Sequence, residues 1–280
     1  MPVFCFTSPA CFTITLPAMR NYHPIWRSFF AVSLIAIAIQ QIIVADFRPV
    51  IVPPSFPSWL PARMAWTWVV SLFFILMSAG ILFKIKAREA SLILGGVLFL
   101  FVLLLHVPYE LGMYPAHLGS WTDPLKCLTL SGGAFVVAGS FPKTNSSPLF
   151  RFLETFIPVG KYFLAITMFL FGIAHFVYAD FVQALVPVWI PPPLFWTYFG
   201  GVALVAAGVG IIGNIKRRLA SLLLGIMLFT WFLILHLPRA IADPHSGNGN
   251  EWTSVFEALA FSGIAFLIAG ESSDKVLKKE

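Results

Sequence analysis

Eight apolar runs, most of them close to twenty residues long, make up the greater part of this chain. A helix rises about 1.5 Å per residue, so a run of this length crosses the hydrocarbon core of a bilayer, which is about 30 Å thick. Backbone amides in lipid must find their hydrogen bonds within the segment, which favours helices. Only 11% of the 280 residues are charged, against about 25% in a soluble domain. The expected spans are 28–47, 65–83, 90–107, 125–141, 162–181, 195–213, 219–237 and 255–270.

The chain contains two copies of one unit. A shift of 130 residues places the segment 57–108 on 187–238 without a gap. Leucine-rich helices match one another by chance, but tryptophans, prolines and histidines do so rarely. The matched pairs include Trp59/Trp189, Pro61/Pro191, Trp66/Trp196, Gly80/Gly210, Lys86/Lys216, His106/His236 and Pro108/Pro238. Each copy holds an even number of spans, so both copies enter the membrane from the same side, as parallel repeats.

The sequence therefore predicts an all-α polytopic transmembrane fold, with eight helices in two parallel-repeat four-helix bundles. We expect an N-terminal tail (1–26), a first repeat (27–142), a cytoplasmic linker (143–160), a second repeat (161–271) and a cytoplasmic tail (272–280). Residues 1–18 are apolar without a basic start, and Met19-Arg20 is a conventional beginning for such a protein. We interpret 1–18 as disordered or as a mis-assigned start.

Basic residues predict the orientation. The tails and the even-numbered connections contain all but four of the 18 Lys and Arg residues. The exceptions are Arg48, Arg63, Lys126 and Arg239. By the positive-inside rule both termini are cytoplasmic, and the chain is a multi-pass protein of the cell (inner) membrane. The net charge of +6 then faces anionic lipid headgroups, so the bilayer is the expected partner and nucleic acid is not.

Ionisable residues gather near the other ends of the helices. They form a candidate functional polar cluster of His175, Asp180, His236, Arg239 and Glu257, with the first-repeat counterparts Asp46, His106 and Lys126. Ionisable groups at membrane depth are costly and often functional. At helix ends they also snorkel or pair across a bundle, so a structural role stays open. Pro108 and Pro238 are expected to end the helices that carry His106 and His236.

Lys126 and Glu257 occupy equivalent positions and have opposite charge. Two parallel copies bring such positions toward a shared interface, so the sequence predicts a buried ion pair between them.

Six tryptophans near the same helix ends predict an interfacial aromatic belt, with ligand stacking as the alternative. They are Trp59, Trp66, Trp121, Trp189, Trp196 and Trp252. We assign no catalytic residue and no metal site. The three cysteines form no C-x-x-C pair, and the histidines have no haem-binding spacing, so dithiol exchange and haem are not expected.

Five short segments of the second copy carry a family resemblance. They read HFVYADF (175–181), VPVWIP (186–191), FWT (195–197), RLA (218–220) and HLPR (236–239). On these segments the whole second copy resembles the DoxX-like four-helix membrane proteins. The first copy departs from the pattern, with Gln41 in place of His175, Tyr109 in place of Arg239 and Lys126 in place of Glu257. The resemblance implies a four-helix membrane unit and, as in some relatives, a subunit of a quinone-linked or redox-stress complex.

Three functions are compatible with the sequence. The favoured one is a non-enzymatic scaffold, anchor or lipid-binding subunit. The alternatives are a quinone-binding membrane subunit with a redox partner protein, and a transporter of small solutes or lipids. A cavity lined by His175, His236 and Glu257 and open to lipid would favour quinone. A polar cavity between the copies would favour transport, and a tightly packed bundle would favour a scaffold.

Overall fold

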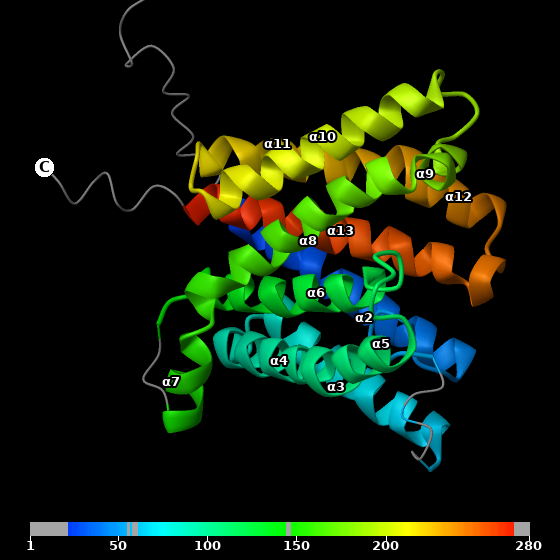
Figure 1. Ribbon diagram of the computed structural model, residues 1–280. Helices are drawn as coiled ribbons and strands as arrows, with labels where there is room; N and C mark the ends of the chain where they lie inside the picture. Colours follow the sequence, from blue (N-terminus) through cyan, green and yellow to red (C-terminus); the bar gives the residue numbers. More distant parts are fainter. Residues whose placement is uncertain (1–21, 55–56, 58–60, 144–146, 272–280) are drawn as a thin grey trace, which may run out of the picture.

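The computed structural model describes residues 22–54, 57, 61–143 and 147–271 (Figure 1). All regular structure in these ranges is helical, which confirms the all-α prediction for them. Trp59, the segment 1–18 and the tail 272–280 lie outside the described residues.

Seven stretches of helix in the described chain are long and apolar enough to cross a membrane. They are α2 (His23–Val44), α3 (Arg63–Leu82), α4 to α5 (Ala87–Met113), α8 (Ile157–Val177), α10 (Pro193–Ile212), α11 to α12 (Arg217–Ala242) and α13 (Asn250–Gly270). The remaining expected span, 125–141, forms helix α6 (Thr122–Gly139). Helix α6 is less apolar because it carries Asp123 and Lys126, and most of its residues are buried against other helices.

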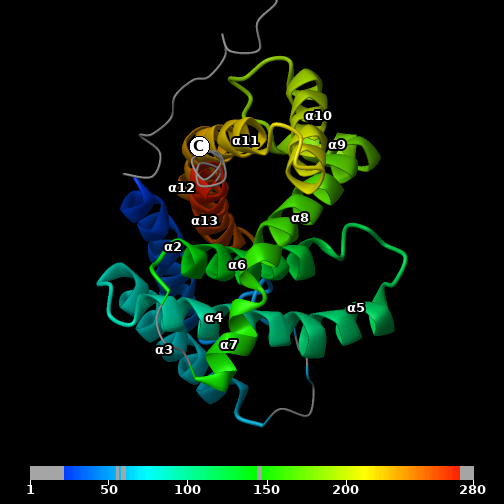
Figure 2. The same cartoon turned by 90° about the vertical axis from the view of Figure 1, so that its left-hand side faces the viewer.

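The seven candidate spans and α6 pack in chain order around a closed ring. Helix α2 contacts α3, α3 contacts α4, and the series continues through α6, α8, α10 and α11 to α13, which returns to α2 (Figure 2). Helices α6 and α13 also touch across the ring and divide it into two lobes. The first lobe contains α2, α3 and α4, and the second contains α8, α10 and α11. The two lobes share α6 and α13, so the first helix of each copy packs on the last helix of the other.

Small residues on the two shared helices allow this arrangement. Gly132 on α6 lies against the backbone of Gly160 on α8, with no room for a side chain. A Cβ on Gly263 of α13 would lie 2.7 Å from the carbonyl oxygen of Trp26 on α2. Close backbone approach at glycine is the usual way in which membrane helices gain van der Waals contact.

The turns α3–α4 and α10–α11 have the same geometry. The amide of Ile85 donates to the carbonyl of Gly80 over 2.8 Å, and the amide of Ile215 donates to that of Gly210 over 2.9 Å. A Cβ on Gly80 would lie 3.1 Å from the carbonyl oxygen of Ile85, and a Cβ on Gly210 would lie 3.2 Å from that of Ile215. Two non-glycine residues in each turn have positive φ. The shared turn explains why the glycine recurs at the same position in both copies.

Pro108 and Pro238 do not end their helices, so that prediction was wrong. Two π-helical segments of five residues each carry the histidines. The segment η2 (Val102–His106) joins α4 (Ala87–Phe101) to α5 (Val107–Met113). The segment η3 (Phe232–His236) joins α11 (Arg217–Trp231) to α12 (Leu237–Ala242). A π turn bonds each amide to the fifth residue before it, which makes room for a proline that lacks an N–H group. Both histidines therefore lie inside continuous helices.

The expected linker 143–160 contains ordered helix. It includes α7 (Pro148–Glu154) and the first residues of α8, and Glu154 of α7 is a partner of Arg88. The Arg88 guanidinium donates to Glu154 Oε1 from Nε and Nη2, over 2.9 and 2.7 Å. These hydrogen bonds lower the pKa of Glu154. The expected tail 1–26 likewise overlaps α2, which begins at His23.

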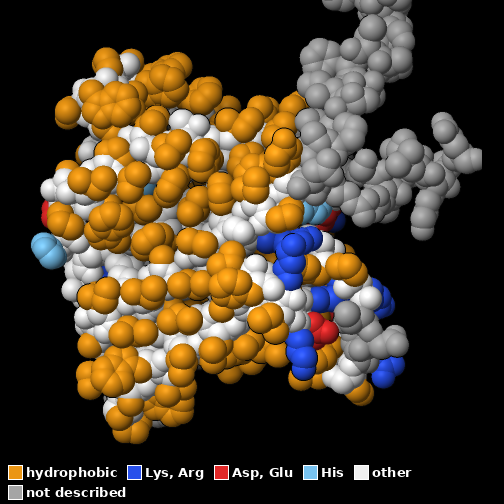
Figure 3. Space-filling view, turned by 180° about the vertical axis from the view of Figure 1, so that it is seen from behind, with side chains coloured by type: hydrophobic (Ala, Val, Ile, Leu, Met, Phe, Trp, Pro, Cys, Tyr) orange, Lys and Arg blue, Asp and Glu red, His pale blue; other side chains and the backbone are white. Residues whose placement is uncertain are grey.

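Lysine and arginine side chains gather at one end of the molecule, called the basic end below (Figure 3). The turns α3–α4 and α10–α11 lie at this end and contribute Lys84, Lys86 and Lys216. His23 and Gly270 contact each other, so the two ends of the helical chain meet on one side. Helices α5, α9 (Ala179–Leu185) and α12 lie together at the opposite side of Figure 1, called the α9 end. The short helix η4 (Ser246–Asn248) precedes α13 there.

Candidate functional site

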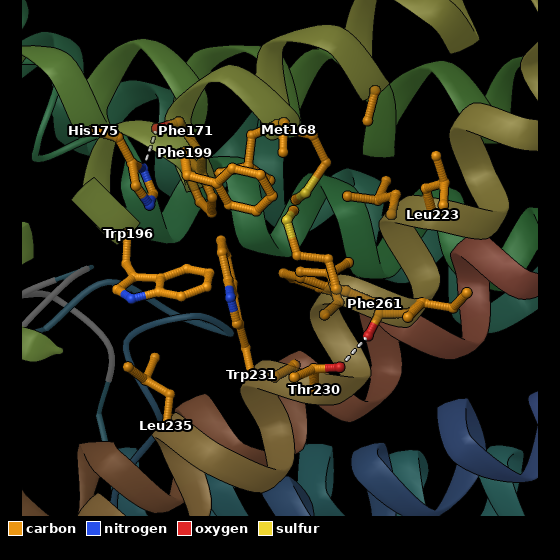
Figure 4. A pocket seen from close by; sticks show the side chains of 18 of the residues that line it. Met168, Phe171, His175, Trp196, Phe199, Leu223, Thr230, Trp231, Leu235 and Phe261 are labelled. Atoms are coloured by element: carbon orange, nitrogen blue, oxygen red, sulfur yellow. Dashed lines mark hydrogen bonds between the residues drawn. The ribbon is translucent and has the colours of Figure 1, made fainter. Parts of the chain in front are cut away.

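The second lobe contains a cavity of about 1050 Å³. It is lined by residues of α8, α10, α11 and α13, with contributions from α9 and from Lys126 of α6. Its walls are mainly apolar, and Figure 4 shows Met168, Phe171, Phe199, Trp231 and Phe261 around it. The volume is at the upper end of the range for small-molecule sites.

Small side chains on α10 help to create this space. Gly200, Gly201, Ala203 and Ala207 all belong to α10, and Ala203 and Ala207 line the cavity. Their first-copy equivalents, 130 residues earlier, are the larger Val70, Ser71, Phe73 and Met77. Helix α3 therefore fills space in the first lobe that α10 leaves unfilled in the second.

The first lobe is closed by its own chain. The segment 47–52 enters it between α2 and α3, and Arg48 and Ile51 are 1% and 0% exposed. His106 lies against the backbone of Val50 and Ile51. The matching connection of the second copy is four residues shorter, since the offset between the copies falls from 134 to 130 across it. In that connection Val188 is fully exposed, and Val186, Pro187 and Ile190 border the cavity without being fully buried, so the connection does not fill the second lobe as 47–52 fills the first.

Lys126 and Glu257 form the predicted ion pair where α6 crosses α13. Lys126 Nζ lies 2.9 Å from Glu257 Oε2, and the two side chains are 16% and 4% exposed. The prediction of a buried pair between the copies is confirmed. Glu257 lies two turns into α13, deeper than expected, because the helix begins at Asn250. Both residues line the cavity.

One oxygen of this pair has no partner. Glu257 Oε1 is buried and accepts no hydrogen bond from any residue that the structure describes. A buried carboxylate oxygen without a donor is costly, and in native proteins such a group calls for an explanation. Because Glu257 lines the cavity, a molecule bound there can supply the missing donor.

His175 and His236 complete the polar part of the lining. The carbonyl of Phe171 can only accept, so His175 Nδ1 donates to it, over 2.7 Å. In the neutral ring this leaves Nε2 as an acceptor. The His175 ring stacks on Trp231, with centroids 6.1 Å apart and planes inclined by 16°. Figure 4 shows the ring directed toward the space between Trp196 and Trp231.

The remaining residues of the predicted cluster do not line this cavity. Asp180 is exposed on α9, where it accepts a hydrogen bond from Gln183 over 3.0 Å. Arg239 Nη2 pairs with Glu251 over 2.6 Å, and its Nη1 donates to the carbonyl of Leu185. Both have local structural partners. The sequence placed them in the cluster because spacing along a helix does not show which way a side chain points.

Of the first-copy counterparts, Lys126 lines the cavity, whereas Asp46 and His106 do not. Asp46 pairs with Arg63 over 2.7 Å, and His106 is buried in the closed first lobe. Arg48 donates to Thr253 Oγ1 over 2.9 Å and to the carbonyl of Asn248 over 2.8 Å. Each of the four basic residues expected away from the basic end is thus held by polar groups of the protein.

The expected aromatic belt is spread over the surface and the cavity. Trp66 and Trp189 are 48% and 61% exposed, and Trp121 and Trp252 are half-buried. Trp196 is exposed on one side and lines the cavity on the other. Trp231 was missed by the sequence reasoning, because an aromatic residue in the middle of an apolar span reads as core. The nearest hint was its spacing of five residues from His236.

A comparison with known proteins finds a match to part of the second copy and gives no role for it. A family model described as a domain of unknown function, DUF8561, matches residues 164–265, which reach from α8 into α13. No curated protein and no solved structure matches the chain. The resemblance to DoxX-like proteins stays a prediction. The matched region contains His175, His236 and Glu257, together with most of the cavity lining.

Proposed function

We propose that this protein binds a lipid-soluble ligand within the membrane and holds it in the cavity of the second lobe. The observation that carries the proposal is the combination of an apolar cavity with a buried, unpartnered carboxylate oxygen. Mostly apolar walls with a few placed polar groups are typical of small-molecule sites. The protein acts on this view as a lipid-binding membrane subunit, without chemistry of its own.

The way into the cavity favours a ligand from the bilayer. Its lining includes side chains that are also exposed on the outside of the ring, among them Leu219, Leu223 and Ile226 on α11 and Phe199 on α10. The cavity therefore opens sideways between α10 and α11, over much of their length. For spanning helices the surroundings at this depth are hydrocarbon, so an apolar molecule can enter without passing through water.

The shape of the α10–α11 pair supports this opening. The two helices are held together near their turn, where a Cβ on Gly210 would lie 2.9 Å from Ala220. Toward the α9 end α10 rises away from α11 in Figure 1. Apart from Lys126 the lining belongs to the second copy, so the cavity reaches the interface of the copies only at the ion pair, which argues against a transport path along that interface.

A quinone-binding redox subunit is the second candidate. The observation that favours it is that His175, His236 and Glu257 line one cavity that opens to lipid. Extraction of the purified protein, followed by an ultraviolet difference spectrum upon reduction, tests this directly. A stoichiometric quinone spectrum would support a redox subunit. If the protein carries another lipid and no quinone, the quinone-binding proposal is refuted and the lipid-binding proposal stands.

The ligand itself is sought by native mass spectrometry of protein purified in mild detergent. The proposal expects one bound lipophile per chain. Ala207→Met, which introduces the first-copy residue, should obstruct the cavity beside α10 and clearly lower the amount of bound lipophile. Val202→Met adds the same side chain at a position that is 59% exposed on the same helix, and it should leave the bound mass in place. Equal occupancy in both variants, or no bound lipophile in the wild type, would overturn the proposal.

We also propose that α6 is the eighth span and that the basic end faces the cytoplasm. In support, α6 occupies one place in the ring of spanning helices, and the two ends of the helical chain meet on one side. A cysteine introduced at His117 should then react with a membrane-impermeant maleimide in intact cells, whereas one at Lys84 should not. The reverse labelling pattern would contradict this orientation.

A further inference from the structure

We infer that the cavity selects an uncharged lipophile whose head donates a hydrogen bond, with that head at Glu257 and His175 and its chain between α10 and α11. The inference rests on the proposed function and deepens it by giving the chemical class of the ligand.

Two polar groups of the cavity lining, Glu257 and His175, offer acceptors, whereas a neutral His236 ring has one donor and one acceptor nitrogen. Glu257 is paired with Lys126 Nζ over 2.9 Å, so it is ionised and its free Oε1 can only accept. His175 donates its Nδ1 proton to Phe171, so Nε2 accepts as well. A hydroxyl or N–H on the ligand satisfies these atoms. A head with acceptors only, such as an ether or an oxidised quinone, does not.

A phosphate or carboxylate head is disfavoured at this end. The cations nearby are already engaged, since Lys126 Nζ also lies 3.6 Å from Asp123 Oδ1 and Arg239 is held by Glu251. A second negative charge beside Glu257 would be repelled in a medium of low dielectric constant. The head that fits is therefore neutral.

One further cation, Lys216, lines the cavity at the basic end. It is exposed, so water satisfies it without a ligand. Glu257 Oε1 is buried and has no such solvent, and the gain from supplying a partner is larger there. The head is thus placed at the α9 end. An anionic lipid held at Lys216 is the competing arrangement.

The position of the head fixes the position of the chain. Trp231 and His175 stack beside the head, and Gly200 allows Trp231 to lie against α10, since a Cβ there would be 3.1 Å from the indole. From this point Leu223 and Met168 line the way toward the basic end. An alkyl or isoprenoid chain can follow these side chains and emerge between α10 and α11.

Three probes with one chain and different heads test the class. They are dibrominated octadecanol, its methyl ether and the corresponding octadecanoate, added to protein in nanodiscs of unbrominated lipid. Bromine quenches tryptophan fluorescence, and Trp196 and Trp231 line the cavity. The difference in quenching between the wild type and Ala207→Met measures how much of the probe occupies the cavity. We expect the ether to bind roughly tenfold more weakly than the alcohol, because a buried acceptor stays unpaired. The octadecanoate should bind more weakly still.

Variants separate the two ends of the cavity. His175→Phe keeps a stacked ring but removes one acceptor, so the preference for alcohol over ether should shrink. Glu257→Gln supplies an amide donor and should abolish the preference for the alcohol over the ether. Lys216→Gln should leave the preference unchanged. If Glu257→Gln fails to fold, the three probes on the wild type still decide between the heads.

Three results would overturn the inference. Equal binding of the ether and the alcohol would show that the acceptors do not select the head. Stronger binding of octadecanoate that depends on Lys216 would place an anionic head at the basic end, while the proposed lipid-binding function would stand. Cavity quenching by none of the probes would overturn this inference, and native mass spectrometry without a bound lipophile would separately overturn the proposed function.

Discussion

Replacement of Lys126 by methionine would leave the Glu257 carboxylate buried beside the cavity without its cation. The two charged atoms lie 2.9 Å apart, so at an effective dielectric constant of about 20 their attraction is about 6 kcal/mol. Much of this is offset by the desolvation of both groups. Breaking a buried pair by removing one partner typically costs about 3–5 kcal/mol.

Thermal unfolding in detergent, followed by size-exclusion chromatography with fluorescence detection, measures this loss. At about 2–4 °C per kcal/mol for a chain of this size, the midpoint should fall by roughly 6–20 °C. The double variant Lys126→Met/Glu257→Met removes both charges and should return to within ~1 kcal/mol of the wild type. The cycle formed by the two single variants and the double variant isolates the coupling between the two side chains.

The reversed pair gives a further check on the reasoning. In Lys126→Glu/Glu257→Lys the new carboxylate lies beside Asp123, whose Oδ1 is 3.6 Å from Lys126 Nζ in the native protein. Like charges at this separation repel, so the reversed pair should be less stable than the double methionine variant. If Lys126→Met has the same unfolding midpoint as the wild type, the account of Glu257 as a costly buried charge is refuted. A double variant no more stable than Lys126→Met would refute the coupling.

Three further predictions use the same unfolding assay. Ile51 is fully buried in the segment that closes the first lobe, so Ile51→Ala should cost about 2–5 kcal/mol, whereas Val188→Ala in the exposed connection of the second copy should change stability by less than ~0.5 kcal/mol; equal losses would argue against the plug. A Cβ on Gly208 would lie 2.8 Å from a carbonyl oxygen of α8, so Gly208→Ala should cost about 1–3 kcal/mol, and Gly112→Ala, with nothing within 4 Å, should be neutral or slightly stabilising. The lowered pKa of Glu154 contributes stability that is complete above the ordinary glutamate pKa of 4.5 and is lost as the pH falls through the lowered value. The unfolding midpoint of Glu154→Gln should therefore be lower at neutral pH and fall less on acidification, and parallel pH curves for the two proteins would contradict this.

Local patterns predicted the helices well and their ends less well. Apolar runs gave the spans because a membrane helix must be apolar over its own length, whatever its neighbours are. The proline positions misled, since Pro108 and Pro238 are accommodated by π turns within longer helices. A proline far from a helix start predicts a break only if the chain has no other way to satisfy its hydrogen bonds.

Part of the candidate site could be predicted as well. The opposite charges at Lys126 and Glu257 indicated a pair, because equivalent positions of two parallel copies approach one another. The same argument placed Asp180 and Arg239 in the cluster, and there it failed. Asp180 points to the surface and Arg239 toward Glu251, and these directions depend on the rotation of short helices that follow a break or a π turn.

The sequence by itself determined the all-α class, the candidate spans and the ion pair, because each depends on the composition of one segment or on two matched positions. Only the tertiary structure decided that the lobes share α6 and α13, that the first lobe is closed and that the second contains a cavity. The closure depends on a connection four residues longer in the first copy and on side-chain size along α3 and α10. These differences fill space or leave it open only where helices from distant parts of the chain meet. Packing depends on both facing surfaces, and the residue spacing along one helix does not determine it.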